Sequence, residues 1–195
     1  MRHGILKSLS LLFLLALVLV SPAPASSQEL VRAPEISGQT WINVKEDRHV
    51  SIKALRGKVI LLVFWTLSDT NCENALLNLN AWYKKYKARG LEIIGVCTPE
   101  WIFDSWHSQF VEKVLGLGVK FPNVFDQASQ NRHAYGLLPW PAFFLVDRQG
   151  YLRAKYHRDF DNFTYSQMET MLGQLLEERG VHRVTRRVLE SEKLI

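Results

Sequence analysis

The segment that decides the fold is residues 59–73, VILLVFWTLSDTNCE. Its first six residues, 59–64, are all apolar, a run too short for a typical helix and too continuous for a half-exposed strand. The run predicts a central strand that is covered on both faces of the sheet. A polar turn at 66–71 follows, and then comes an amphipathic helix that carries Cys72 in its first turn. The free N–H groups and the dipole of such a helix end can stabilise a thiolate.

The rest of the chain predicts further strands and helices around this unit. Strands are expected at 91–97, 121–125, 142–146 and 151–157, and helices over 72–86, near 106–114, before Tyr135 and at 164–178. The last two strands are separated by a short polar turn and predict a hairpin. Residues 41–44 and 50–52 flank a charged turn, which predicts a second, N-terminal hairpin. Thr70 and Asp69 are equally suitable N-caps for the helix that carries Cys72.

Residues 1–25 read as a secretory signal peptide, because a short basic start and an apolar stretch precede Ala-Pro-Ala. The apolar stretch, 9–20, is shorter than the roughly 20 residues that cross a bilayer. We therefore expect a periplasmic or secreted protein without a stable membrane anchor after cleavage. Residues 26–34 are expected to be an extended leader, 35–178 one folded domain, and 179–195 a basic C-terminal tail.

The composition argues against nucleic-acid and metal binding. The formal net charge is +5, and much of the basic excess lies near the C-terminus, while the lysines at 84–87 alternate with tyrosines on a predicted solvated helix face. His107, His133 and His157 are scattered at no metal-ligand spacing. We expect no metal, no cofactor and no nucleic-acid partner.

A family resemblance rests on residues 64–72, FWTLSDTNC. They resemble the Phe-Trp-Thr-x-Ser-Cys-x-x-Cys segment of thioredoxin-like redoxins, in particular the redoxin domain of DipZ-type proteins and more distantly the TlpA/ResA group. Residues 41–58 resemble the lead-in of the same family. The resemblance covers roughly 35–178. It implies an α/β, thioredoxin-like fold in which a central mixed sheet is flanked by helices, with a redoxin-type insertion before the late hairpin.

The sequence departs from that family at the position of its first active-site cysteine, which is Asp69 here. In the family this cysteine attacks a disulfide, and the second, which aligns with Cys72, resolves the mixed disulfide. A carboxylate beside a thiol favours the neutral thiol, so Asp69 should raise the pKa of Cys72. The helix proline of the family is also replaced, by Leu77. Both changes suggest a scaffold released from dithiol catalysis.

Four more residues complete the candidate site. Cys97 ends the neighbouring strand, where DipZ-type domains have a histidine, and it is expected near the same rim of the sheet as Cys72. Pro141 aligns with the cis-proline of the family, and the backbone of Trp140 could take up an extended segment by strand addition. Trp65 is expected to line the same groove.

Two functions follow from these residues. One is a thiol–disulfide oxidoreductase-related protein that acts on a protein thiol or disulfide, either through Cys72 alone or through Cys72 paired with Cys97. The other is a redox-inactive binding or chaperone module that takes an extended peptide segment at the groove around Trp140 and Pro141. A peroxiredoxin is disfavoured, because its motif requires a threonine at the position of Asp69.

Overall fold

The computed structural model describes residues 30–45, 50–100, 106–136, 138–157 and 162–178. The helices and strands are β1 (Thr40–Ile42), β2 (Val59–Trp65), α2 (Thr70–Tyr86), a short 3₁₀ turn (Lys87–Arg89), β3 (Leu91–Cys97), α3 (Trp106–Gly116), β4 (Asn123–Phe125), α4 (Gln130–Ala134), β5 (Ala142–Val146), β6 (Leu152–His157) and α5 (Asn162–Glu177). The predicted signal peptide and C-terminal tail lie outside the described residues. Within the described ranges, no helix has the length and apolar content needed to cross a membrane.

One mixed sheet organises the domain, with the strand order β1-β4-β3-β2-β5-β6. Every residue of β2 and β3 is buried, which confirms the prediction of a doubly covered central strand. β2 pairs in parallel with β3 and antiparallel with β5, and β5 forms the predicted hairpin with β6. β4 and α4 lie where the insertion was expected, between the second β–α unit (β3 and α3) and that hairpin.

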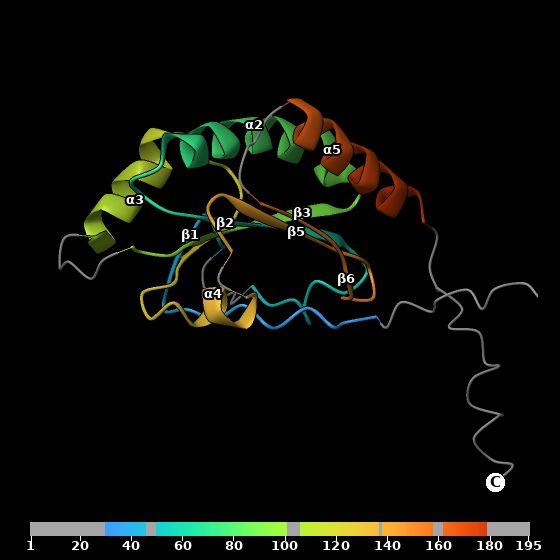
Figure 1. Cartoon of the computed structure of the whole chain (residues 1–195), viewed down its shortest axis with the longest axis horizontal. Helices are drawn as coiled ribbons and strands as arrows, with labels where there is room; N and C mark the ends of the chain where they lie inside the picture. Colours follow the sequence, from blue (N-terminus) through green and yellow to red (C-terminus); the bar gives the residue numbers. More distant parts are fainter. Residues whose placement is uncertain (1–29, 46–49, 101–105, 137, 158–161, 179–195) are drawn as a thin grey trace, which may run out of the picture.

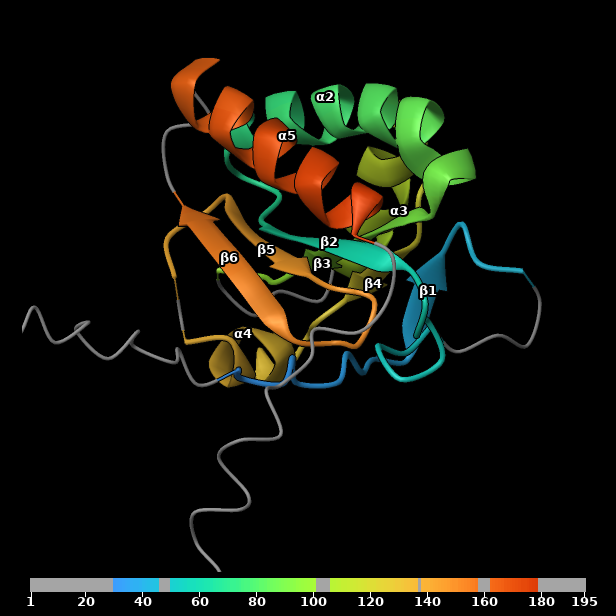
Figure 2. The ribbon, with the colours of Figure 1, turned by 90° about the vertical axis from the view of Figure 1, so that its right-hand side faces the viewer.

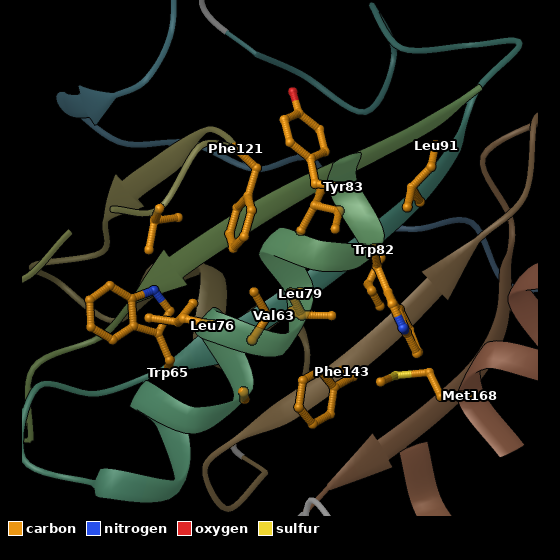
Figure 3. Close-up of a cluster of buried hydrophobic side chains, with 14 of the residues drawn as sticks. Val63, Trp65, Leu76, Leu79, Trp82, Tyr83, Leu91, Phe121, Phe143 and Met168 are labelled. Carbon is orange, nitrogen blue, oxygen red and sulfur yellow. The ribbon is translucent and has the colours of Figure 1, made fainter. Parts of the chain in front are cut away.

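Helices cover the two faces of the sheet unequally (Figures 1 and 2). α2, α3 and α5 lie on one face, whereas α4 and the N-terminal segment lie on the other. Each face has its own apolar core. The core on the helix-rich face contains Trp65, Cys72, Cys97 and the inward side chains of α2, and part of it is drawn in Figure 3. The second core contains Phe64, Phe144 and Tyr135.

Asp69 is the N-cap of α2 and decides where this helix begins. Its backbone is extended, and its Oδ1 accepts a hydrogen bond of 2.7 Å from the backbone N–H of Asn71. Between the two caps that the sequence allowed, the structure therefore uses Asp69 rather than Thr70. The predicted inward stripe of α2 is confirmed, since Cys72, Ala75, Leu76, Leu79, Trp82, Tyr83 and Tyr86 are buried.

The predicted N-terminal hairpin is wrong. β1 pairs antiparallel with β4, with Trp41 opposite Val124, and residues 50–52 form no strand. Ile52 is buried in the core of the second face instead. The physical reason is that β4 would otherwise present an unpaired edge, which pairing with β1 covers. A local hairpin between residues 41–44 and 50–52 would leave that edge open.

Residues 31–42, the N-terminal strap, run along the second face and reach both edges of the sheet. At one edge, Arg32 bridges to Tyr151, and the N–H of Leu152 donates to the carbonyl of Val31 at 2.8 Å. At the other edge the strap becomes β1. Between the two edges the hydroxyl of Tyr135 donates to the carbonyl of Pro34 at 2.6 Å, which ties the strap to the end of α4.

Candidate functional site

The site lies where the carboxyl ends of β2 and β3 meet the start of β5. In the parallel pair Trp65 is opposite Cys97, and in the antiparallel pair Phe64 is opposite Ala142. The turn that starts α2 therefore emerges beside Cys97 and beside the residues that precede β5. These pairings bring Asp69, Cys72, Cys97, Trp140 and Pro141 to the same end of the central strands.

Cys72 is fully buried and held as a thiol. The pKa of Cys72 is raised to about 12; burial is the largest cause, and the nearby carboxylates Asp69, Glu100 and Glu73 contribute smaller amounts in the same direction. A hydrogen bond from the backbone N–H of Thr66 acts in the opposite direction. The effect expected of Asp69 has the right sign, but exclusion of water is the larger cause, because burial disfavours the charged form.

Cys97 is a second buried thiol in the same apolar core. Burial raises its pKa well above the ordinary value, and Cys72 and Asp126 contribute in the same direction. Both cysteines are free, so no disulfide joins them in this structure. The pair is close enough for one thiol to affect the ionisation of the other, yet neither sulfur meets solvent.

Asp69 has a structural role at the start of α2. It is half-buried, and its carboxylate accepts from the helix backbone. A negative side chain at a helix N-terminus is favourable because it satisfies free N–H groups and complements the dipole. This carboxylate therefore stabilises the start of α2 and supplies no sulfur for disulfide exchange.

Trp65 does not line a groove, which corrects the sequence-based expectation. Its side chain is fully buried with Val63 and Leu76, as Figure 3 shows. Its indole Nε1 donates to the Oδ1 of Asn123 at 3.1 Å. Strand alternation places Trp65 on the α2 face of the sheet, under that helix, so it supports the site from below.

Gly95 makes room for this buried hydrogen bond. It lies opposite Asn123 in the β3–β4 pair, and a Cβ at position 95 would lie 1.9 Å from the Oδ1 of Asn123. The Nδ2 of Asn123 donates to the carbonyl of Phe121 at 3.0 Å. Asn123 escaped sequence reasoning, although a glycine inside a buried strand is a signal of close approach.

Trp140 and Pro141 form the other wall of the site. The peptide bond between them is cis, the conformation that the family resemblance implies. Trp140 is half-buried and packs against the cores of both faces. The guanidinium of Arg132 lies over its ring, 4.1 Å from the centroid. Sequence reasoning missed Arg132, because nothing local links α4 to this corner.

α4 connects this corner to the end of β3. The backbone N–H of Asp126 donates to the carbonyl of Cys97 at 2.8 Å. The carboxylate of Asp126 accepts from the backbone N–H groups of Asn131 and Arg132, at 3.1 and 3.0 Å. Cys97, Asp126 and Arg132 thus form a continuous support for Trp140. In the described parts of the chain, histidine, cysteine and acidic side chains do not gather into a group of three that could hold a metal.

Comparison with known proteins agrees with this geometry. Residues 31–155 match the AhpC/TSA family. The chain belongs to that family. The chain is 34% identical over 159 residues to the protein DipZ of Mycobacterium tuberculosis, a match that covers 81% of the chain and 22% of DipZ. It is 34% identical over 105 residues to the thiol-disulfide oxidoreductase ResA of Bacillus anthracis, a match that covers 54% of the chain and 58% of ResA.

The chain therefore spans about a fifth of DipZ and just over half of ResA. Among solved structures it is similar to a thioredoxin-like protein in the oxidized form, with a TM-score of 0.66 and 23% identity. The match covers 77% of this chain and 98% of that protein. For a DsbE-type thiol:disulfide interchange protein from Chlorobium tepidum, the TM-score is 0.63 and the identity 21%, and the match covers 76% of this chain and 98% of that protein. These similarities confirm the thioredoxin-like redoxin fold and the relation to DipZ and ResA proteins.

Proposed function

We propose that this chain is an exported relative of the thiol–disulfide oxidoreductases whose Asp69-x-x-Cys72 site does not turn over disulfides. It acts as a binding module for an extended segment of a partner protein, at the edge formed by Trp140 and Pro141. The observation that carries the proposal is the state of the two sulfurs. Cys72 and Cys97 are both buried, and both have a raised pKa.

Disulfide exchange needs an accessible thiolate, because the thiolate is the attacking species. A pKa of about 12 for Cys72 leaves roughly one thiolate in 10⁵ molecules at pH 7. The residue one helical turn earlier, which would reach solvent first, is a carboxylate. Dithiol catalysis thus has neither its nucleophile nor an activated second sulfur.

The segment that precedes β5 supports the binding role. Pairing between β2 and β5 ends at Phe64 and Ala142, so Trp140 and Pro141 lie just beyond the last paired residues. Backbone groups at such a position can accept an added strand, which binds through main-chain hydrogen bonds. A protein thiol or disulfide partner inherited from the family would present such an extended segment around its own cysteine.

A second candidate function uses the two thiols, and their proximity favours it. Cys72, as thiolate, would attack a partner disulfide and release one partner thiolate, which takes up a proton. Cys97 would then displace the second partner sulfur from Cys72. The partner disulfide is reduced to two thiols, and Cys72 and Cys97 are oxidised to one disulfide. This route requires local opening of the buried core around both sulfurs.

One experiment separates the candidates. Free thiols of the purified protein are counted with and without reductant, and reduction of a protein disulfide is then assayed for wild type, Cys72→Ser and Cys97→Ser. The proposal expects two thiols in both counts and no turnover in any of the three. Turnover in wild type that disappears in Cys72→Ser overturns it in favour of the thiol mechanism.

Replacing Asp69 by cysteine tests the alignment of the site. Asp69→Cys should form a reducible disulfide with Cys72 and gain disulfide reductase activity, because the fold around it is that of the family. The matched control is Asp69→Cys with Cys72→Ser, which lacks the second sulfur of the family pair and should not cycle. A folded Asp69→Cys protein that never forms the disulfide would show that residues 69 and 72 are not the counterparts of the family dithiol.

Export is tested by mass. The first 25 residues are proposed to be removed, so the protein recovered from outside the cytoplasm should begin at Ser26. An intact N-terminus on the exported protein, or recovery only from the cytoplasm, contradicts this part of the proposal.

A further inference from the structure

Buried polar atoms without partners gather at the Trp140 corner. In the described ranges, four buried side-chain nitrogen or oxygen atoms have no hydrogen-bond partner: Thr66 Oγ1, Arg132 Nε, Trp140 Nε1 and Trp82 Nε1. The first three belong to the corner. Trp82 lies elsewhere, in the core of the α2 face beside Tyr165. Buried polar groups are normally satisfied, so three orphans in one place point to a missing partner.

The chain brings these three residues to the carboxyl end of β2. Thr66 directly follows β2 and Trp140 lies two residues before β5, so both flank the last β2–β5 pair, Phe64–Ala142. Thr66 is fully buried there. Arg132 of α4 lies over the Trp140 ring at 4.1 Å.

Arg132 also lacks a counterion. Among the described residues its guanidinium makes no ion pair; besides lying over the Trp140 ring, it makes one long hydrogen bond of 3.5 Å from Nη2 to the carbonyl of Leu138. The carboxylate of Asp126 is engaged by backbone N–H groups of α4, including that of Arg132 itself. A half-buried cation without an anion is costly unless something else supplies one.

We propose that this corner binds a carboxylate. A carboxylate supplies only acceptors, which suits the N–H groups of Arg132 and Trp140 and the hydroxyl of Thr66, and its charge neutralises Arg132. The inference rests on the proposed binding function and names its preference: an acidic side chain, or a chain-terminal carboxylate, in the segment that docks beside Trp140 and Pro141. Arg132 and Thr66 are then the residues that determine specificity.

The test follows the indole N–H signal of Trp140 by NMR, assigned through its loss in Trp140→Phe. Wild-type protein is titrated with N-acetyl-aspartate methylamide, with its neutral counterpart N-acetyl-asparagine methylamide, and with N-acetyl-glycine and acetate. The aspartate compound should shift the signal with millimolar affinity, as expected of a fragment, and the asparagine compound at least tenfold more weakly. The three carboxylate compounds are ranked by affinity. Tightest binding by the aspartate compound indicates an acidic side chain as the ligand, by acetyl-glycine a chain-terminal carboxylate, and by acetate a free acid.

Arg132→Gln should weaken the aspartate compound at least tenfold, and Thr66→Val should weaken it less. Arg89→Gln, which removes an exposed arginine outside the site, should leave it unchanged. If Arg132→Gln fails to fold, the wild-type comparison and Thr66→Val decide. Equal shifts by the aspartate and asparagine compounds, or no shift by any carboxylate, overturn the proposal. If no carboxylate binds but a neutral extended peptide does, the carboxylate preference is wrong and the proposed binding function is retained. If a carboxylate binds but no extended peptide does, the proposed binding function is wrong and the carboxylate site is retained.

Discussion

The two ends of β3 hold their buried polar groups in different ways. Near its amino end, the carboxylate of Glu92 is buried but has partners. The hydroxyl of Tyr83 donates to it at 2.7 Å, and the Nζ of Lys58 lies 3.5 Å away. Lys87 in turn donates to the Tyr83 hydroxyl at 2.7 Å. At the carboxyl end, Cys97 lies beside Cys72 in a region that also holds the unsatisfied hydroxyl of Thr66.

This difference separates the parts of the sheet that serve stability from those kept for a site. A satisfied network strengthens a core, whereas an unsatisfied group costs free energy and persists where something outside the resting protein uses it. The region at the carboxyl end of β3 keeps such a group, the hydroxyl of Thr66. The comparison predicts that removing a polar group will lower the free energy of unfolding at the amino end of β3 and will change it little at the carboxyl end.

The largest expected effect concerns the thiols of the carboxyl end. Because the pKa of Cys72 is raised from 9.0 to about 12, alkylation of the folded protein should be roughly a thousandfold slower than that of the unfolded chain between pH 7 and 9. In the folded state the rate should rise tenfold per pH unit without a plateau below about pH 12. Iodoacetamide labelling followed by mass spectrometry measures both. A plateau near pH 9 would mean that the sulfur is solvated.

The next effect comes from Gly95, in the middle of β3. Gly95→Ala forces a methyl group against Asn123 and breaks the hydrogen bond to Trp65, so the free energy of unfolding should fall by about 3 kcal/mol. Urea denaturation measures the loss. Gly173→Ala is the matched control, because its Cβ would meet no atom within 4 Å and α5 should gain about 0.5–1 kcal/mol. Equal outcomes would mean that Gly95 is not a point of close approach.

A pair of near-isosteric substitutions tests the comparison directly. Tyr83→Phe leaves an oxygen of Glu92 without its donor and should cost about 1–2 kcal/mol. Thr66→Val removes a hydroxyl that has no partner, so stability should stay within about 0.5 kcal/mol of wild type or rise. Thermal or urea unfolding of both variants decides. A comparable loss in both would show that the Thr66 hydroxyl is satisfied in solution.

A modest effect is expected at Asp69. Asp69→Ala should cost about 1 kcal/mol, since the cap of α2 is lost. Asp69→Asn retains a capping oxygen and should cost less, while it removes one of the charges that raise the pKa of Cys72. Alkylation of Asp69→Asn should therefore be faster by less than tenfold, because burial remains. An increase of a hundredfold would make Asp69 rather than burial the main control on the thiol.

Local pattern was sufficient for much of the fold. The apolar run of β2 and the inward stripe of α2 are properties of neighbouring residues, and both were predicted with their bounds nearly right. The N-terminal hairpin failed because the partner of β1 is β4, about 80 residues further on, and nothing local announces that pairing. A pairing so distant depends on which edge the finished sheet leaves open.

The candidate site divides in the same way. Asp69 and Cys72 could be placed from one motif, and the family resemblance placed Pro141. Trp65 was misassigned because the exposure of a side chain at the end of a strand depends on which elements cover that face. Arg132 and Asn123 act only through contacts between elements distant in sequence, a packing side chain in one case and a buried amide in the other. Such roles follow from tertiary packing and leave little trace in the sequence.

The N-terminal strap has a practical consequence for anyone who trims this protein. It hydrogen-bonds beside β6 and forms the strand next to β4, so a truncation that starts after Ile42 would uncover both margins of the sheet at once. Unpaired edge strands can pair with strands of other molecules, so the shortened protein should self-associate or precipitate even if its remaining core folds. Affinity tags and cleavage sites therefore belong upstream of Val31.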